Sequence, residues 1–171
     1  MQESKQAKEI ILTKNPPNYS LTGECKITLA NGKKRRLDKI KVGDMVLGVD
    51  KETNKVVPCK VIKSDTLEDI KTYGSFNKYT FSDGQFIKIV ADHKFYNTDK
   101  KVFEFINSCN TRDRFLKEDG SIVKLIEKKF YNRCVHHFEI DTTLHNYFAN
   151  GFLVGTNDVN NFDFNKIDYK A

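Results

Sequence analysis

The sequence predicts an all-β domain, because it combines short alternating segments, turn dipeptides between them and little helical periodicity. Strand-like runs occupy residues 27–30, 42–50, 55–63, 78–81, 85–90, 121–126 and 134–140. The turn dipeptides are Asn31-Gly32, Asp83-Gly84, Asp119-Gly120 and Asn150-Gly151. Residues 103–108 could form one short helical turn. Many short strands joined in this way are typical of a curved or closed antiparallel sheet.

A chain of 171 residues is long enough for one buried core and short for two full domains. No apolar run reaches the roughly 18 residues of a membrane span, and the N-terminus has no apolar signal region. We therefore expect a cytoplasmic protein with no membrane partner, and a monomer. The segments 1–19 and 158–171 are polar, which is typical of flanking segments.

Charge and cysteine spacing exclude some classes of site. The net charge is +6, and the only basic cluster is the KKRR run at 33–36, a pattern more typical of a solvated hairpin than of a nucleic-acid site. No nucleic-acid partner is expected. The four cysteines form no CxxC pair, so neither a zinc ribbon nor a thioredoxin-type motif is present.

Three segments carry residues suited to catalysis. Ser20 precedes the strand-like run at 27–30, and His93 ends VADH at 90–93. The stretch 134–157 holds three histidines and one cysteine. Taken alone, Ser20 could be a turn or capping residue, and His93 could be structural, although histidine is the natural proton carrier near neutral pH.

The third segment also allows a metal site. Cys134, His136, His137 and His145 are possible zinc ligands, but strand alternation places His136 and His137 on opposite faces. A zinc site made by Cys134, His136 and His137 is therefore a weaker interpretation than a catalytic one.

In this order and at these distances, the segments resemble the Hint superfamily of inteins, bacterial-intein-like domains and hedgehog autoprocessing domains. SLTGECKITLANG at 20–32 is similar to the family's opening CLTGDTKITLADG, with Ser20 at the nucleophile position. Four later segments of the chain resemble the family's later sequence blocks: RLDKIKVGDMVLGVD (36–50), KIVADHKFYN (88–97), VHHFEI (135–140) and HNYFANGFLV (145–154). The last of these segments is similar to the family pattern H-N-F-x-A-N-G-x-x-V.

The resemblance covers 20–157 and implies a horseshoe-like β fold with pseudo-two-fold symmetry and no inserted endonuclease. Residues 1–19 and 158–171 then become extein-like flanks, which are the domain's own reaction partners. The resemblance also implies a central cleft in which Ser20 meets residues 155–157.

In this family the nucleophile attacks the preceding carbonyl, which here belongs to the Tyr19-Ser20 bond. His93 would polarise this bond or protonate its nitrogen, and Val90 replaces the threonine that assists it. His137 stands at the usual acidic position. A serine hydroxyl needs a base beside it, whereas a thiol does not, so Ser20 is a slower natural nucleophile or a Cys→Ser change.

The C-terminal junction departs from the splicing pattern His-Asn followed by Cys, Ser or Thr. Counted from Asn150-Gly151, the His position falls on Gly155 and the Asn position on Thr156. Asn157 lies one residue beyond the expected Asn position. If a one-residue bulge brings Asn157 into the cleft, its cyclisation would use His145 for proton transfer. Thr156 could alternatively accept the acyl group. Asp158 cannot act as the acceptor nucleophile, so cleavage at one or both ends is expected rather than full splicing.

Two other hypotheses remain open. The first is a Hint-fold binding or structural module that has lost its chemistry through Ser20, Val90 and Gly155. The second is that zinc binds the domain and inhibits processing. The reaction itself requires no cofactor. For the core we predict Ile27, Leu29, Val46, Leu47, Ile87, Ile89, Ile140, Phe148, Phe152 and Val154.

Overall fold

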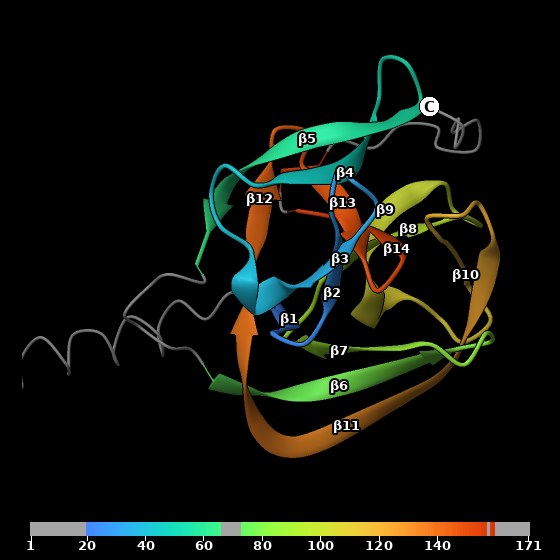
Figure 1. The fold of residues 1–171 in the computed structure, drawn as a ribbon. Helices are drawn as coiled ribbons and strands as arrows, with labels where there is room; N and C mark the ends of the chain where they lie inside the picture. Colours follow the sequence, from blue (N-terminus) through green and yellow to red (C-terminus); the bar gives the residue numbers. More distant parts are fainter. Residues whose placement is uncertain (1–19, 66–72, 157, 160–171) are drawn as a thin grey trace, which may run out of the picture.

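The computed structural model describes residues 20–65, 73–156, 158 and 159, and more than half of these residues form strands (Figure 1). The strands are β1 (Ser20–Thr22), β2 (Lys26–Thr28), β3 (Lys34–Arg36), β4 (Met45–Asp50), β5 (Lys55–Ser64), β6 (Tyr73–Phe81), β7 (Phe86–Val90), β8 (Lys94–Asn97), β9 (Val102–Phe105), β10 (Arg114–Leu116), β11 (Ile122–Phe138), β12 (Ile140–Thr142), β13 (Asn146–Ala149) and β14 (Phe152–Gly155). Two short 3-10 helices, η1 (Leu37–Lys39) and η2 (Ile106–Ser108), complete the described elements.

The strands form one large, strongly curved sheet and one small sheet. The large sheet runs β1-β7-β6-β11-β10-β8-β14-β13-β2-β3, with β9 on β8, and the small sheet runs β12-β5-β4. Strand β1 pairs with both β7 and β11, so β1, β7, β6 and β11 close on themselves. The predicted all-β class is therefore confirmed, and the first strand lies inside the fold rather than at an edge.

Strand β11 differs from the prediction of two separate strands at 121–126 and 134–140. It continues without a break over Ile122–Phe138 and curves around one end of the molecule (Figure 1). Its middle, EKKFYNR at 127–133, is polar and gives no alternating signal. Pairing with β6 maintains the strand there, and two irregularities in register, after Leu125 and after Tyr131, accommodate its curvature. The expected helical turn at 103–108 is also wrong in part, because its first half is strand β9.

The predicted turn dipeptides lie between strands as expected. Asn150 and Gly151 join β13 to β14 with φ values of 48° and 82°, the left-handed pair that a tight hairpin requires. The Asn150 side chain accepts a hydrogen bond from the Lys26 backbone N–H at 2.8 Å. This one turn therefore also fixes β2 against the hairpin.

Aromatic and aliphatic side chains fill the space between the strands. Phe81, Phe95 and Phe152 are fully buried and pack ring against ring. All predicted core residues are buried except Leu47, which is half-buried beside a second cluster around Phe148. Burial of this apolar surface is the main driving force for the fold.

The basic run at 33–36 lies on the exposed hairpin of β2 and β3. Lys34 contacts Glu118, Arg35 lies 3.1 Å from Asp44, and Arg36 lies 2.8 Å from Asp38. Carboxylates therefore partner three of the four basic side chains, which fits a solvated hairpin.

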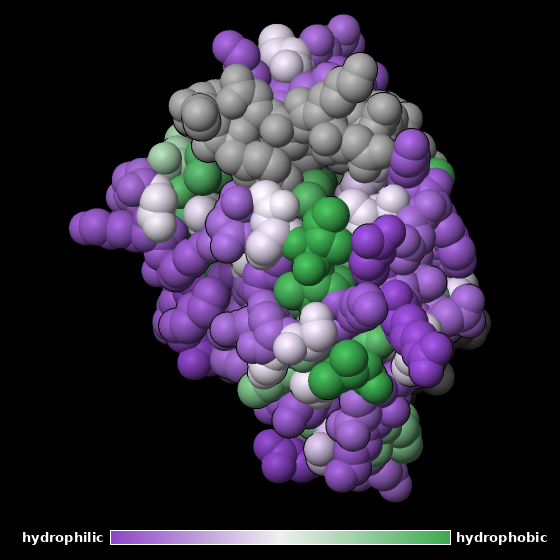
Figure 2. Space-filling view, turned by 90° about the vertical axis from the view of Figure 1, so that its right-hand side faces the viewer, coloured by the Kyte–Doolittle hydropathy of each residue, from purple (hydrophilic) through white to green (hydrophobic). Residues whose placement is uncertain are grey.

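No helix in the described residues is long and apolar enough to span a membrane. Figure 2 shows a largely hydrophilic face crossed by a narrow hydrophobic strip.

The side chain of Asn146 joins β13 to β4 across the boundary between the two sheets. Its Oδ1 accepts a hydrogen bond from the Val49 N–H at 2.7 Å, and its Nδ2 donates to the Val49 carbonyl at 3.0 Å. Gly48 makes this contact possible, because a Cβ there would lie 2.9 Å from Asn146 Oδ1. The buried amide satisfies two backbone groups that β4 leaves unpaired on this side.

We predict that Asn146→Ala lowers the free energy of unfolding by about 2 kcal/mol, because it leaves a buried N–H and C=O without partners. Urea denaturation at neutral pH measures the change. Asn132→Ala, on the exposed part of β11, is the matched control and should change stability by less than about 0.5 kcal/mol. Equal effects of the two substitutions would contradict a stabilising role of the hydrogen bonds between Asn146 and Val49.

Candidate functional site

Both ends of the described domain meet at one short bend between β7 and β8. Ser20 pairs with Val90 at the end of β7, while Gly155 pairs with Lys94 at the start of β8. Residues 135 positions apart in the sequence are thus held by neighbouring backbone groups of the segment 90–94. This segment contains His93, which is fully buried.

The backbone nitrogen of Ser20 is anchored at this bend. It donates a hydrogen bond of 2.9 Å to the carbonyl of Asp92, the residue before His93. This nitrogen belongs to the Tyr19-Ser20 peptide bond, although Tyr19 lies outside the described residues. Ser20 itself is fully buried in the ring of strands β1, β7, β6 and β11.

Side chains on both sides hold the bend in an unusual conformation. Ala91 has a φ of 64°, which costs about 1 kcal/mol or more for a residue with a Cβ. Asn107 of η2 donates from its Nδ2 to the Ala91 carbonyl at 2.9 Å. The Asp92 carboxylate accepts from the N–H groups of His93 and Asn107 at 2.9 and 3.1 Å. Tyr79 in turn bonds the Asn107 amide.

The imidazole of His93 lies between a carboxylate and a backbone carbonyl. Its Nε2 is 2.7 Å from Glu139 Oε2, and its Nδ1 is 3.1 Å from the carbonyl oxygen of Lys94. Tyr147, fully buried on β13, donates from its hydroxyl to Glu139 Oε1 at 2.6 Å and lies 3.3 Å from His93 Nε2. Burial and the nearby Glu139 raise the pKa of Tyr147, so this residue is a neutral donor.

The C-terminal junction is less fully bonded. The N–H of Thr156 donates to the His145 carbonyl at 2.9 Å, which continues the β13–β14 pairing by one residue. Thr156 Oγ1 is buried and has no hydrogen-bond partner among the described residues. Asn157, the candidate for cyclisation, lies outside the described residues.

Gly155 occupies a position that has no room for a side chain. A Cβ at this residue would lie 2.6 Å from Val159 Cγ1 and 2.9 Å from Phe103 Cδ1. A histidine here would therefore have to displace Val159. The sequence motifs predict that Gly155 stands where the splicing pattern has histidine, and in the structure neighbouring side chains fill the space beside it.

Several solved structures, inteins among them, have a fold similar to that of this chain. The chain matches a DnaB intein from Synechocystis sp. PCC 6803 with a TM-score of 0.67, at 17% identity over 81% of this chain and 98% of the other. It matches the G-1F mutant of the Ssp DnaB mini-intein variant M86 with a TM-score of 0.69, at 16% identity over 81% and 98%.

It also matches a bacterial intein-like domain from Clostridium thermocellum, with a TM-score of 0.66 and 23% identity over 80% of this chain and 98% of the other. This chain has the Hint fold. The fold predicted from the sequence motifs is therefore confirmed. No protein-family model and no curated protein sequence matches the chain.

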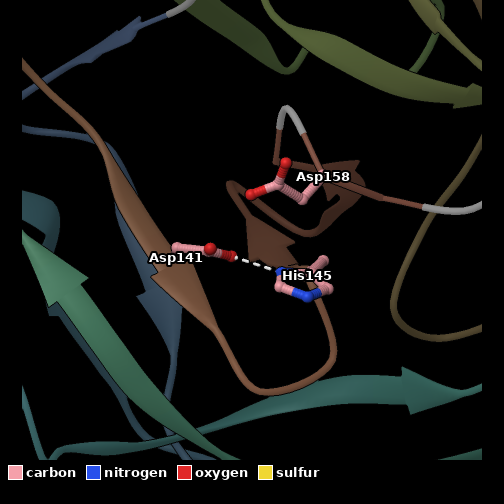
Figure 3. Close-up of side chains that lie close together, drawn as sticks. All are labelled: Asp141, His145 and Asp158. Atoms are coloured by element: carbon pink, nitrogen blue, oxygen red, sulfur yellow. Dashed lines mark hydrogen bonds and ion pairs between the residues drawn. The ribbon is translucent and has the colours of Figure 1, made fainter.

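His145 is paired with an acidic residue on β12. His145 is half-buried with a φ of 58°, and its Nδ1 lies 2.9 Å from Asp141 Oδ1. Asp141, His145 and Asp158 each place one ligand atom within 4.8 Å of the others, and Figure 3 shows the three side chains around the junction. One nitrogen and two carboxylate oxygens form a donor set suited to zinc.

The weaker zinc interpretation drawn from the sequence involves Cys134, His136 and His137, and only the two histidine side chains are described. His136 and His137 alternate along β11, as expected: His136 is half-buried and stacks on Phe138, whereas His137 is buried opposite Thr22 of β1. The side chain of Cys134 lies outside the described residues. Among the described residues, the group of Asp141, His145 and Asp158 is the candidate for a metal site.

The described cysteines belong to the interior. Burial raises the pKa of Cys59 to about 11 and that of Cys109 to about 12, and it raises the pKa of Cys25 further. None of these thiols is free to ionise near neutral pH, and only the thiolate is nucleophilic. Cys25, five residues after Ser20, therefore does not substitute for it.

Sequence reasoning missed several polar residues of the site. Glu139 and Tyr147 bond His93, and Asp92 and Asn107 hold the bend, yet none was identified beforehand. One signal was available, because the family pattern H-N-F that the sequence resembles has phenylalanine where this chain has Tyr147. A hydroxyl added at a strand position that normally packs in the core needs a buried partner.

We predict that His137 makes the folded domain less stable in mild acid. Burial lowers the pKa of His137 from 6.5 to about 4, so between these values the unfolded chain binds a proton that the folded chain does not. The contribution of His137 to stability is therefore lost as the pH falls from 6.5 towards 4.

Urea midpoints at pH 7.5 and 4.5 measure this loss, which should be smaller in His137→Leu than in the parent chain. His136→Gln, one residue away and half-buried, is the control and should keep most of the parent's pH dependence. An unchanged loss in His137→Leu would contradict the prediction.

Proposed function

We propose that the chain is a self-processing domain that acts once on its own flanking segments, by an N-to-O acyl shift at Tyr19-Ser20. The observation that carries this proposal is the 2.9 Å hydrogen bond from the Ser20 nitrogen to the Asp92 carbonyl, directly beside His93. The nitrogen that must leave the peptide bond is thus fixed next to the histidine best suited to protonate it. The confirmed Hint fold supports the same assignment.

In the proposed step, Ser20 Oγ attacks the carbonyl carbon of Tyr19, and the bond from this carbon to the Ser20 nitrogen breaks. His93 gives a proton to the departing nitrogen, and the hydroxyl proton returns to His93, so the ring ends as it began. The product is an ester of residues 1–19 on Ser20 with a free amino group. Hydrolysis of this ester would release residues 1–19.

The local geometry supports the shift in two further ways. The bend at Ala91 is held by Asn107 and Asp92, so the Asp92 carbonyl keeps its place while the peptide bond changes to an amine. Complete burial of Ser20 and His93 excludes water, which strengthens electrostatic interactions at the site. The side chain of Val90 offers no hydrogen-bond donor, so His93 is the residue that transfers the proton.

At the other junction we propose cleavage rather than ligation. The side-chain amide of Asn157 would attack its own carbonyl carbon and release the segment that begins at Asp158, with His145 as the proton carrier. Asp158 offers no nucleophile for joining the two flanks, and the splicing histidine is absent because Val159 and Phe103 fill the space beside Gly155. Self-cleavage, with inefficient splicing at most, is the expected outcome.

A second candidate function is a silent Hint-fold module. It is favoured by the same filled position at Gly155 and by the contacts that both ring nitrogens of His93 make within the domain. In such a module, a substitution of His93 would change only the stability of the fold.

We predict that Ser20→Cys speeds cleavage at Tyr19-Ser20 by at least about tenfold, because a thiol ionises near neutral pH and a hydroxyl does not. Intact-mass spectrometry of the full chain over a day, with added thiol for the Cys version and hydroxylamine for the Ser version, detects loss of residues 1–19.

His93→Ala in the Ser20→Cys background is the test variant and should slow this cleavage at least about a hundredfold. His136→Ala is the matched control and should leave it unchanged. Intact masses of both the parent and the Ser20→Cys chain would reject self-processing and favour the silent module.

We also propose that zinc inhibits processing by binding Asp141, His145 and Asp158, since it would occupy the proton carrier beside the C-terminal junction. Titration calorimetry with Zn²⁺ should show one site that Asp158→Asn weakens and that Glu127→Gln, an exposed control on β11, leaves unchanged. Loss of binding in Cys134→Ser instead would assign the zinc to Cys134 and its neighbours. The absence of any binding would remove the inhibition hypothesis.

A further inference from the structure

The 3-10 helix η2 holds the bend between β7 and β8 through hydrogen bonds to three consecutive residues. The N–H of Ile106 donates to the His93 carbonyl at 2.9 Å. The N–H of Asn107 donates to the Asp92 carboxylate at 3.1 Å, and Asn107 Nδ2 donates to the Ala91 carbonyl at 2.9 Å. Asn107 therefore supplies the only side chain among these donors, and this side chain reaches the first residue of the bend.

The amide of Asn107 is oriented by its two partners. The Ala91 carbonyl can only accept a hydrogen bond, so the NH2 end of the amide faces it. The oxygen end then faces Tyr79, whose hydroxyl donates to it. Tyr79 is fully buried on β6, whereas Asn107 is exposed. A residue of the rigid core thus fixes an amide that lies at the surface.

Ala91 is the residue of the bend that needs such a restraint. Its φ of 64° lies in the left-handed region, which an L-residue with a Cβ disfavours about five- to thirtyfold. Glycine is the usual residue at such a position, because it has no Cβ. A change of φ at Ala91 would move the carbonyl groups that follow it. One of these is the Asp92 carbonyl, which accepts the Ser20 N–H at 2.9 Å.

We propose that Asn107, held by Tyr79, is a positioning residue that keeps Ala91 in the left-handed conformation. The Asp92 carbonyl is then directed at the Ser20 nitrogen, which leaves the peptide bond in the proposed acyl shift, and the role rests on that shift. Asn107 acts through the backbone of the bend rather than on the reacting atoms. Its contribution is the fixed place of the nitrogen, and small displacements of a reacting group are costly in rate.

The first test is the rate of cleavage in the full-length Ser20→Cys chain. Asn107→Ala removes the donor to the Ala91 carbonyl and should slow cleavage about tenfold, as expected from the cost of the left-handed conformation. Asn110→Ala is the matched control, because Asn110 is an exposed asparagine of the same segment. It should leave the rate unchanged.

A substitution at the bend separates positioning from a general loss of structure. Glycine adopts positive φ about as readily as negative φ, so Ala91→Gly removes the need for the asparagine. The double variant Ala91→Gly with Asn107→Ala should therefore cleave within about threefold of the Ser20→Cys parent. A double variant as slow as Asn107→Ala alone would contradict the proposal.

Tyr79→Phe tests the second half of the proposal, since it removes only the hydroxyl that orients the amide. It should slow cleavage about threefold. It should have no further effect when Asn107 is already alanine, because the two groups act through one contact. Tyr96→Phe is the control, since Tyr96 is also fully buried but belongs to the second core cluster. Additive effects of Tyr79→Phe and Asn107→Ala would contradict the link between them.

A second readout does not depend on cleavage. In the intact Ser20→Ala chain, hydrogen exchange measured by NMR reports how firmly the amide of residue 20 is bonded to the Asp92 carbonyl. Asn107→Ala should speed this exchange about tenfold, and added Ala91→Gly should restore it. The Thr156 amide, which donates to the His145 carbonyl, is the internal reference and should keep its exchange rate.

The outcomes distinguish this role from the proposed function. Cleavage in the Ser20→Cys chain that Asn107→Ala does not slow, or unchanged exchange at residue 20, would overturn the role while self-processing stands. No cleavage in any Ser20→Cys chain would reject self-processing and this role with it. Ala91 and Asn107 are both exposed, so their substitution leaves no cavity in the core, and thermal unfolding verifies that each variant is folded during the assay.

Discussion

The hydrogen bond from the Ser20 nitrogen to the Asp92 carbonyl is the contact on which the candidate site depends. It exists because β1 is an interior strand, held between β7 and β11, rather than a free end of the sheet. The length and curvature of β11 make this possible, since one end of that strand pairs with β10 and the other reaches β1. The topology therefore brings the start of the domain to His93, and β14 brings its end to the same bend.

Burial gives this bend its chemical character. His93 packs edge-on against the rings of Phe95 and Tyr147 in the buried interior, where an unpaired charge or hydroxyl costs several kcal/mol. Glu139 compensates for this by bonding both His93 and Tyr147. The same low-dielectric surroundings that make the network costly also strengthen each interaction within it. Stability and chemistry are therefore coupled here, and the site behaves as part of the core rather than as a surface cleft.

The sequence predicted what short-range patterns encode. Turn dipeptides such as Asn150-Gly151 and alternating runs such as 85–90 identified strands correctly, because their signals depend on neighbouring residues. The polar middle of β11 carried no such signal, since pairing with β6 decides its conformation. Motif similarity located Ser20 and His93, but the partners of His93 come from segments 46 and 54 residues away, and no local pattern reports on such contacts.

The two junctions share a bend but differ in the groups that could move protons. At the first junction, the Ser20 nitrogen is fixed beside a histidine whose ring nitrogens both have buried partners. At the second, Gly155 is flanked by the apolar side chains of Val159 and Phe103, and the Thr156 hydroxyl has no partner among the described residues. His145, the nearest proton carrier there, is paired with Asp141 rather than with the His93 network. The asymmetry between the two junctions is the structural reason for proposing cleavage at the first flank rather than joining of the two.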